Sequence, residues 1–334
     1  MKPIALVLSL FICLAPATAL AWGGSGHRMI GQAAMESLPS DLPAFLRTPK
    51  AAADVGELAR EPDRWKGAGK VHDQNRDPGH FVDLSDDGTI LGGPRLETLP
   101  TTRKDYEAAL KAVGTNSWEA GYLPYSILET QQQLTKDLAY WRVTSAAERL
   151  ERSASRRAWL AADRLRREYL ILATLGQLAH YVGDGSQPLH VTIHYNGWGD
   201  FPNPKGYTTA RVHGPFESDF VAANIHKDQV RHAMSPLTPP NGPLDMRVAA
   251  FLVTTGQAVV PLYDLEKQGG FEGDNAKGLA FALERVAVGA SEFRDLIVEA
   301  WRVSPKVTVG WPAISLADVE AGRVDAYLSL YSKD

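Results

Sequence analysis

Cysteine is almost absent from the sequence. Cys13 is the only one among 334 residues, and it lies in an N-terminal segment with the features of a signal peptide. The basic residue Lys2 precedes the apolar run IALVLSLFICLA, and the segment ends in Ala19-x-Ala21. We therefore expect residues 1–21 to be removed on export, which leaves Trp22 as the first residue of a secreted or periplasmic protein. The mature chain then has no cysteine and cannot form disulfide bonds.

The sequence also lacks a strong excess of either charge. Removal of the signal peptide takes away one lysine, so that 34 Lys and Arg face 39 Asp and Glu, and the formal net charge changes from −4 to −5. A mildly acidic chain has no overall attraction for nucleic acid or anionic lipid. A phosphate-bearing substrate must therefore be attracted locally, for example by metal ions. We expect no integral membrane segment after cleavage, since the apolar run of the signal peptide is too short to span a membrane.

Sustained alternation of apolar and polar residues, which marks strands, is scarce, whereas helical periodicity is frequent. Internal repeats and low-complexity tracts are absent. We therefore expect an all-α protein, with residues 22–334 forming a single large helical domain. The predicted helices cover residues 27–38, 103–113, 123–143, 156–184, 243–268, 276–303 and 315–332. Gly, Pro, Asn and Asp cluster in three predicted loops, at residues 66–77, 83–100 and 196–207.

The segment HYVGDGSQPLH, residues 180–190, combines metal-binding residue types with a helix end. His180 and Asp184 are four residues apart, so on a helix their Cβ atoms lie about 6 Å apart on one face. An imidazole and a carboxylate at this spacing can bind one zinc ion, although a structural His–Asp hydrogen bond is an alternative. Pro188 ends the helix, and His190 is then expected beside the helix end, facing a different metal.

A second pair with the same spacing occurs downstream in VHGPFES. His213 and Glu217 are four residues apart, and Pro215 places His213 near the start of a helix. Together with His190 they form the two-histidine, one-carboxylate set of a catalytic zinc site that keeps a position for water. The alternative is an exposed histidine with an unrelated glutamate nearby.

Three further candidates lie upstream. In NRDPGHFVDL, His80 follows a Pro-Gly turn and can join the ligand set of His180. Asp63, in LAREPDRW, is a further carboxylate, either as a zinc ligand or as a general base, or else only a helix cap. In WGGSGH, the freed α-amine of Trp22, with a pKa of about 8, can bind a metal together with its own carbonyl oxygen and with His27. The alternative for this last motif is an ordinary frayed N-terminus.

Taken together, these motifs resemble those of a known superfamily. N-terminal Trp, His, Asp and His, followed by H-x-x-x-D-x-x-x-x-x-H and H-x-x-x-E, resemble the pattern of zinc-dependent phospholipases C and single-strand-specific zinc nucleases of the nuclease P-one type. The motifs cover residues 22–217, and beyond them only the helical character agrees. The resemblance implies an all-α fold with three zinc ions (Zn2+) in one cleft, and an exported zinc-dependent hydrolase of phosphate esters.

Position by position, the resemblance implies three zinc sites. The first is held by His80, His180 and Asp184, with Asp63 as ligand or base; the second by His190, His213 and Glu217; the third by the Trp22 amine and carbonyl, His27 and a shared Asp184 oxygen. Two zinc ions can lower the pKa of a shared water toward 7, and the remaining ion can stabilise the leaving oxygen. The remaining histidines match no position of the pattern: His72, His194, His226 and His232.

The sequence leaves the substrate open. The five-residue gap from Trp22 to His27 is nuclease-like, which favours single-stranded nucleic acid or nucleotides and an endonuclease or phosphodiesterase activity. Glu217 in place of Asp is phospholipase C-like, which keeps phospholipid as the alternative. The choline pocket of those phospholipases is not matched, because Ser25 and Asp77 occupy its positions, and the Gly-Gly-Asn segment of the nucleases is replaced by NGWGD.

Three aromatic residues of the predicted loop at 196–207, namely Trp198, Phe201 and Tyr207, can either stack on a base or only cover the cleft. Two other interpretations of the whole chain also remain. The protein can bind zinc without catalysis, or its histidines can be structural and bind no metal.

Overall fold

The computed structural model describes residues 22–331. The predicted signal peptide, residues 1–21, therefore lies outside the described residues. Within residues 22–331 the secondary structure is helical, no strand is formed, and β-type pairing is confined to isolated bridges such as that between Val82 and Gly121. The predicted all-α class is confirmed.

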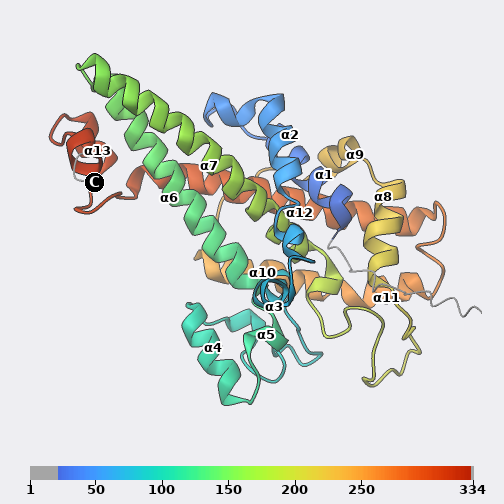
Figure 1. The fold of residues 1–334 in the computed structure, drawn as a ribbon. Coiled ribbons are helices and arrows are strands. Elements are labelled where there is room, and N and C mark those ends of the chain that lie inside the picture. Colours follow the sequence, from blue (N-terminus) through green and yellow to red (C-terminus); the bar gives the residue numbers. More distant parts are fainter. Residues whose placement is uncertain (1–21, 332–334) are drawn as a thin grey trace, which may run out of the picture.

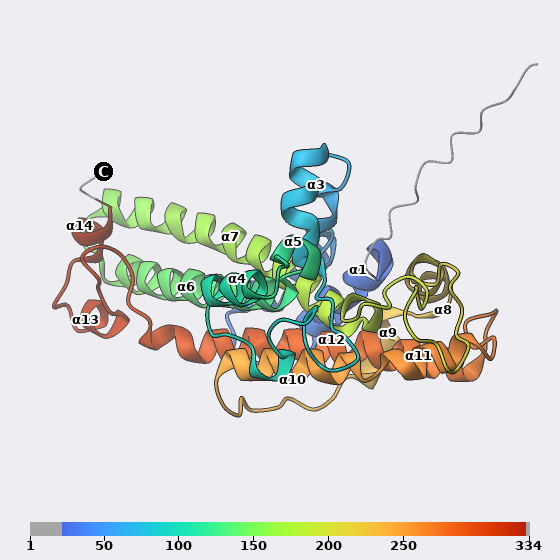
Figure 2. The same ribbon diagram turned by 90° about the horizontal axis from the view of Figure 1, so that it is seen from below.

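The longest helices form the frame of the molecule (Figure 1). Helices α6 and α7 are joined by a short turn and pack side by side over most of their length, and α12 packs against both. Seen from below, α12 and the α10–α11 segment run along one side of the α6–α7 pair (Figure 2). The bounds of these five helices are α6 Leu123–Leu150, α7 Ala154–Ser186, α10 Leu244–Gly256, α11 Val259–Glu266 and α12 Ala276–Val303.

None of the remaining helices is as long as α6, α7 or α12. In the N-terminal half they are α1 Gly23–Glu36, η1 Ala44–Arg47, α2 Pro49–Leu58, η2 Pro62–Trp65, α3 Lys70–Arg76, η3 Asp77–His80, η4 Leu96–Thr98, α4 Arg103–Ala112 and α5 Ser117–Ala120. After α7 they are η5 Pro188–His190, the π-helix η6 Pro215–Phe220, α8 Val221–Asn224, α9 Lys227–Ala233, η7 Ser304–Lys306, α13 Leu316–Glu320 and α14 Ala326–Leu330. Helices α1 and α2 pack against the last turns of α7, whereas α13 and α14 lie near its opposite end.

Glycines in the second half of α7 allow neighbouring helices to approach closely. A Cβ on Gly176 would collide with Leu58 of α2, and a Cβ on Gly185 would lie 2.7 Å from the ring of Phe251 on α10. Contacts this short do not occur between real Cβ atoms and side chains, so these positions require glycine. The end of α7 is thereby enclosed by several helices, and this burial decides the chemistry of the side chains it carries.

Three sequence predictions of secondary structure are wrong in detail. The predicted loop at 66–77 contains helix α3, which buries none of its own residues. It is held by tertiary contacts, including Arg76 stacked over Trp65 at 3.7 Å and the Tyr122 hydroxyl donating to the Asn75 carbonyl. The predicted C-terminal helices at 243–268 and 315–332 each form two shorter helices, because local turns interrupt a helical apolar pattern that continues across them.

By length and composition alone, the apolar stretch Leu244–Glu266 could cross a membrane, which is weak evidence because core helices pass the same test. The stretch is interrupted between α10 and α11, and Val248, Leu252 and Leu262 within it are buried against other helices of the protein. The absence of a membrane-spanning segment after signal cleavage stays a prediction.

Candidate metal centre

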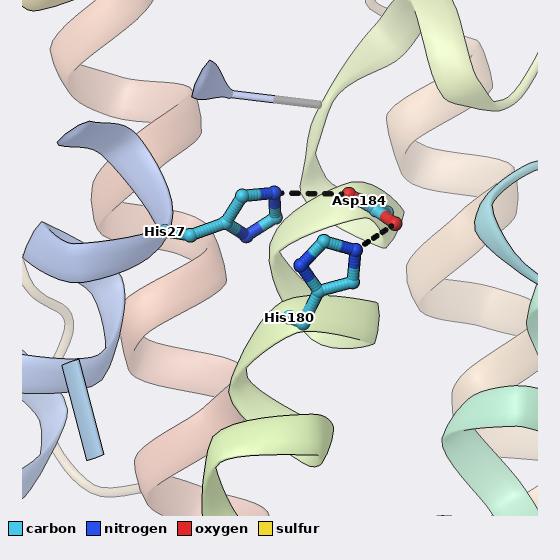
Figure 3. Close-up of side chains that lie close together, drawn as sticks. All are labelled: His27, His180 and Asp184. Carbon is cyan, nitrogen blue, oxygen red and sulfur yellow. Dashed lines mark ion pairs between the residues drawn. The ribbon is translucent and has the colours of Figure 1, made fainter. Parts of the chain in front are cut away.

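The end of α7 places His180 and Asp184 at the centre of a buried polar cluster. Both side chains are fully buried. Nε2 of His180 lies 3.3 Å from one oxygen of Asp184, and Nε2 of His27, on α1, lies 3.3 Å from the other oxygen (Figure 3). The His27 and His180 rings stack with their centroids 4.0 Å apart. A Cβ on Gly183 would lie 2.9 Å from Nδ1 of His27, so glycine at this position allows His27 to enter the cluster.

Two short helices add a second group to this cluster. Asp63 lies in η2 and His80 ends η3, and Nε2 of His80 is 4.0 Å from Oδ1 of Asp63. Ligand atoms of Asp63, His80 and His180 lie within 4.8 Å of one another, as do those of His27, His180 and Asp184. His180 therefore belongs to two candidate metal groups.

The third group is formed by His190, His213 and Glu217. Nε2 of His213 lies 2.9 Å from Oε2 of Glu217, and Nε2 of His190 lies 3.8 Å from the same oxygen. The predicted pairing across four residues is thus present, but Glu217 belongs to the π-helix η6 rather than to an α-helix. Short π-helical turns are rare and are frequently found at functional sites.

Hydrogen bonds of the second ring nitrogen fix the orientation of four histidines. Each Nδ1 donates to a backbone carbonyl, because a carbonyl oxygen can only accept. The bonds are His80 to Asp77 (3.0 Å), His180 to Ala59 (2.8 Å), His190 to His80 (2.6 Å) and His213 to Tyr195 (2.9 Å). With the proton on Nδ1, the neutral imidazole presents the lone pair of Nε2 to the cluster. Histidines that bind metals are held in this way.

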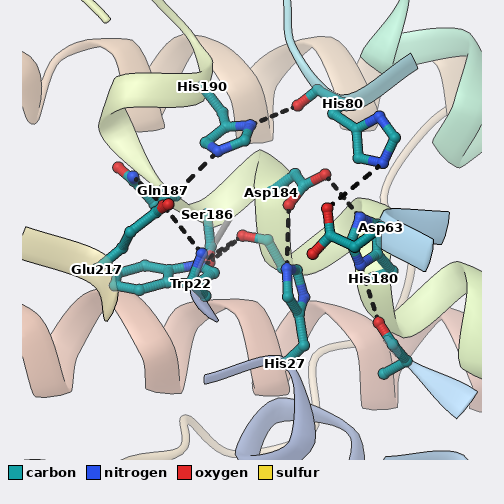
Figure 4. Close-up of polar contacts among 12 residues, drawn as sticks. Trp22, His27, Asp63, His80, His180, Asp184, Ser186, Gln187, His190 and Glu217 are labelled. Carbon is teal, nitrogen blue, oxygen red and sulfur yellow. Dashed lines mark hydrogen bonds and ion pairs between the residues drawn. The ribbon is translucent and has the colours of Figure 1, made fainter. Parts of the chain in front are cut away.

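Several of the inward-facing atoms have no hydrogen-bond partner among the described residues. They are both ring nitrogens of His27, Nε2 of His80 and His180, both oxygens of Asp184, and Oε1 of Glu217. Figure 4 shows these side chains converging from different segments of the chain. Buried polar atoms without partners are costly and uncommon. A group of them in one place therefore fits bound cations.

His190 and His213 give a second reason to infer a cation. Their Nε2 atoms lie 3.1 Å apart, and both rings donate through Nδ1, so two lone pairs face each other. A proton on one ring can relieve this contact. A zinc ion can relieve it as well, since two nitrogens bound to one tetrahedral zinc at about 2.0–2.1 Å are about 3.3 Å apart.

The backbone nitrogen of Trp22 lies 3.0 Å from Oε2 of Glu217. The indole Nε1 of Trp22 donates to the carbonyl of Gly183 at 2.7 Å and contacts the hydroxyl of Ser186 at 3.1 Å, which fixes this residue against the end of α7. Its carbonyl oxygen accepts from the amide of Gly26 and so closes the first turn of α1. The structure therefore places the Trp22 nitrogen beside the group of His190, His213 and Glu217.

The arrangement differs in one respect from the expected ligand sets. The sequence prediction joins His27 and the Trp22 amine through Asp184, and His180 to His80. In the structure, His180 lies within reach of both His27 and His80, and the Trp22 nitrogen contacts Glu217. The nine predicted residues are close together. The groups that they form in space differ from the ligand sets expected from the sequence.

The pKa values reflect the high density of buried charge. Burial and the neighbouring His180 lower the pKa of His80 to about 3. Burial opposes the charged form of His190, but Asp184 and Glu217 outweigh it and raise its pKa to about 9. Burial by itself would raise the pKa of Asp63, yet the charges of His180 and Lys66 lower it to about 2. Asp63 is therefore a carboxylate at neutral pH, as a metal ligand must be.

A cavity of about 540 Å³ opens beside the cluster. His80, His190 and His213 contribute to its wall. The other lining residues are Lys66, Gly67, Asp73, Asp77, Phe81, Asp83, Glu119, Leu189, Tyr195 and Asn196. The candidate metal groups thus border a space that can admit a small molecule.

Sequence reasoning missed several residues around the cluster. Lys66 places its ammonium 2.9 Å from Oδ1 of Asp63. The side-chain amide of Gln187 donates to Oε2 of Glu217 at 3.0 Å. The guanidinium of Arg285, buried on α12, donates to the Ser186 carbonyl at 3.1 Å and to the Thr255 hydroxyl at 3.2 Å, so it supports the end of α7. Lys66, Gln187 and Arg285 do not belong to a Pro-Gly or i, i+4 pattern of the kind that marks the candidate ligands. No such sequence signal therefore points to them.

The four unassigned histidines stay outside the three groups. Among them His194 is buried, its Nε2 lies 3.0 Å from Oδ1 of Asp86, and its ring stacks on Trp198 with ring centroids 3.8 Å apart. Trp198 and Tyr207 are themselves buried and pack against Tyr263. The sequence leaves base stacking and a covering role open for these two aromatics, and their burial against other side chains favours a covering role. Phe201 is largely exposed.

A scan of the sequence against protein-family models finds no matching family, and a search of curated proteins finds no match. The class of the site is therefore defined by its own chemistry. Three buried groups of histidine and carboxylate can hold metal ions in a helical protein, in agreement with the expectation of three metal sites.

Proposed function

We propose that the protein is an exported zinc-dependent hydrolase of phosphate esters, related in fold to the zinc-dependent phospholipases C and single-strand-specific nucleases. The observation that carries this proposal is the cluster of buried, unpartnered nitrogen and oxygen atoms beside an open cavity. A core with only a structural role would pair such atoms with one another.

The donor set favours zinc. The ligands are imidazole nitrogens and carboxylate oxygens without thiolates, and sites that keep a position for water typically combine histidines with a single carboxylate. The group of His190, His213 and Glu217 has this composition. We assign the other two groups to zinc as well, with Asp184 and His180 at the boundary between them. When bound, the zinc ions supply Lewis acidity toward the phosphate and an acidified water.

The protein residues around the cavity have separate tasks in this proposal. Histidine Nδ1 bonds to backbone carbonyls hold the ligand nitrogens in place before substrate arrives. Asp63 acts as a ligand, because its carboxylate lies in one buried group with Nε2 of His80 and His180. Lys66, 2.9 Å from Asp63, keeps that carboxylate ionised and oriented.

The position of Trp22 supports export with cleavage after residue 21. Its backbone nitrogen already lies beside Glu217 in a buried position. Cleavage would convert this nitrogen into an α-amine with a pKa of about 8, which can bind a metal near neutral pH. The proposed site is then completed by processing of the chain.

The test is metal analysis of the purified mature protein combined with a substrate panel. We expect close to three zinc ions per chain and hydrolysis of single-stranded DNA, RNA or nucleotides, with phospholipid micelles as the second substrate class. Bound zinc without hydrolysis of any of these would support the non-catalytic alternative. Absence of bound metal, with no loss of stability on addition of a chelator, would instead leave the histidines with a structural role.

A further inference from the structure

The cavity beside the metal groups has an acidic wall. Asp73, Asp77, Asp83 and Glu119 line it, and within the described residues Lys66 is the single Lys or Arg that does so. The ammonium of Lys66 is already paired, 2.9 Å from Asp63 and 3.9 Å from Asp77. The cavity wall therefore offers an incoming anion little positive charge of its own.

The nearby cations of α3 do not change this balance. Lys70 and Arg76 are exposed and lie outside the cavity lining. The guanidinium of Arg76 stacks over Trp65 at 3.7 Å. Asp73, on the same helix, instead faces the cavity and accepts from the amide of Gly67.

Bound metal ions offset the acidic groups without creating a large excess of positive charge. Three divalent ions carry six positive charges, and the ligand carboxylates of Asp63, Asp184 and Glu217 cancel three of them. Asp73, Asp77 and Glu119 together with Lys66 cancel two more, and Asp83, whose pKa burial raises to about 7, cancels part of another. The whole site is then close to neutral. One phosphate is attracted by the metals at short range, but further phosphates of a polymer meet the carboxylates of the wall.

We propose that the site selects short phosphate esters that carry a single phosphate over long nucleic acids. This inference rests on the proposed function and narrows its substrate class. The physical cause is repulsion between the acidic wall and the phosphates that flank the scissile one in a polymer. This repulsion extends about 30 Å at 0.01 M salt and about 8 Å at physiological ionic strength.

The first test compares substrates that share a linkage but differ in charge. The zinc-loaded mature protein is assayed on a dinucleoside monophosphate, on a single-stranded oligonucleotide of the same bases and on glycerophosphocholine. At low salt we expect kcat/KM per linkage to be about tenfold higher on a single-phosphate substrate than on the oligonucleotide. The oligonucleotide rate should rise when salt is increased, because salt screens repulsion. The first and third substrates distinguish a nucleoside alcohol from a lipid-type alcohol.

The second test removes a wall charge. Glu119→Gln is expected to raise kcat/KM on the oligonucleotide about threefold at low salt, with a smaller change on the dinucleoside monophosphate. Glu119→Lys should extend this trend. The control is Glu97→Gln, which removes an exposed carboxylate that lines a different cavity and pairs with Arg95. It should leave the ratio between the two substrates unchanged. The zinc content of each variant verifies that the metal centre is intact.

The outcomes distinguish the selection of short substrates from the proposed hydrolase function. Faster cleavage of the oligonucleotide, with a rate that falls as salt is added, would overturn the selection of short substrates and leave the hydrolase proposal standing. An unchanged substrate ratio in both Glu119 variants would also overturn it. Hydrolysis of none of the substrates by zinc-loaded protein would remove the proposed function, and the substrate selection with it.

Discussion

Helix α7 has a charged first half and a buried end, and both contain buried carboxylates. In the first half, the nearly buried Asp163 accepts from Nε of Arg166 at 3.2 Å and from Nε of Arg167 at 2.9 Å. At the end, Asp184 is fully buried, and neither of its oxygens has a hydrogen-bond partner among the described residues. Helix α7 therefore satisfies the Asp163 carboxylate with its own arginines. The Asp184 carboxylate is left without a donor from the helix and is available to a bound cation.

This difference separates structural from functional burial. Where only packing is required, neighbouring side chains can meet every donor and acceptor, as the arginines do for Asp163. Around Asp184 the neighbours are His27 and His180, and Nε2 of neutral His180 is an acceptor because its Nδ1 donates to the Ala59 carbonyl. A bound cation satisfies all of these atoms at once. Substitutions around Asp184 are therefore expected to lower metal content, and substitutions around Asp163 are expected to lower only stability.

The largest effect is expected for His180→Ala, because His180 belongs to two of the three metal groups. We expect the variant to lose at least one zinc ion per chain, and phosphate ester hydrolysis to fall about a thousandfold, which corresponds to about 4 kcal/mol of transition-state stabilisation. Zinc content and kcat/KM on the preferred substrate measure the two losses.

Asp163→Asn is the matched control at the other end of α7. It removes the charge from a carboxylate paired with Arg166 and Arg167, and we expect unfolding in urea to become easier by about 1 kcal/mol. Zinc content should be unchanged. Loss of zinc in this variant, or its full retention in His180→Ala, would contradict the division of the helix into a structural and a metal-binding end.

The next largest effect is expected from one residue added before Trp22. The addition converts the α-amine into an amide, which no longer binds metal, and we expect zinc content to fall and activity to decrease about 10- to 100-fold. The comparison variant is Trp22→Phe, which removes the indole bonds to Gly183 and Ser186 but keeps the amine. If the extended protein retains full zinc and full activity, the N-terminus is not a ligand.

The sequence is sufficient to predict the helical class and to find the residues of the three candidate metal groups. His180 with Asp184, and His213 with Glu217, are recognisable because a helical repeat brings residues four apart onto one face. His190 follows because a proline ends the helix just before it. These signals depend only on residues close together in the sequence. His213 and Glu217 therefore still face each other although Glu217 belongs to the π-helix η6 and not to an α-helix.

The division of ligands among the metal groups is not predictable in the same way. It depends on how α1, η2 and η3 pack around α7, and glycines such as Gly183 set those distances through contacts with residues far away in the sequence. Lys66 and Asp83 enter the cavity wall for the same reason. Trp198 and Tyr207 show the converse case, because their aromatic character suggests a binding role until their burial is known.

A moderate effect is expected for Arg285→Met. Arg285 contacts no metal ligand atom; it donates to the Ser186 carbonyl and so positions the turn that follows Asp184. We expect zinc affinity, measured by competition with a chelator, to fall about tenfold, and the visible spectrum of the cobalt-substituted protein to change. Arg285→Lys should restore part of the affinity.

Arg294→Met is the control for Arg285. Arg294 is similarly buried on α12, but its guanidinium donates to the Ser235 carbonyl and to Asp295, and these residues do not belong to the metal groups. We expect its loss to lower the melting temperature and leave zinc affinity and the cobalt spectrum unchanged. Equal effects of the two substitutions on metal affinity would show that Arg285 contributes only to general stability.

The smallest effect concerns a third way to satisfy a buried carboxyl group, namely with a proton. Burial and the neighbouring Asp295 raise the pKa of Glu292 on α12 to about 7. The folded protein then holds an extra proton between about pH 4.5 and 7 relative to the unfolded chain, so this group reduces stability as pH rises through that window. Glu292→Gln should leave the free energy of unfolding unchanged at pH 4 and raise it by about 1 kcal/mol at pH 8. Glu299→Gln, which deprives Arg247 of its 2.6 Å partner, should instead destabilise the protein at pH 8. Urea unfolding at the two pH values distinguishes the two variants. If Glu292→Gln is no more stable than the unsubstituted protein at pH 8, the Glu292 carboxyl group is satisfied by charge pairing, like Asp163, and not by protonation.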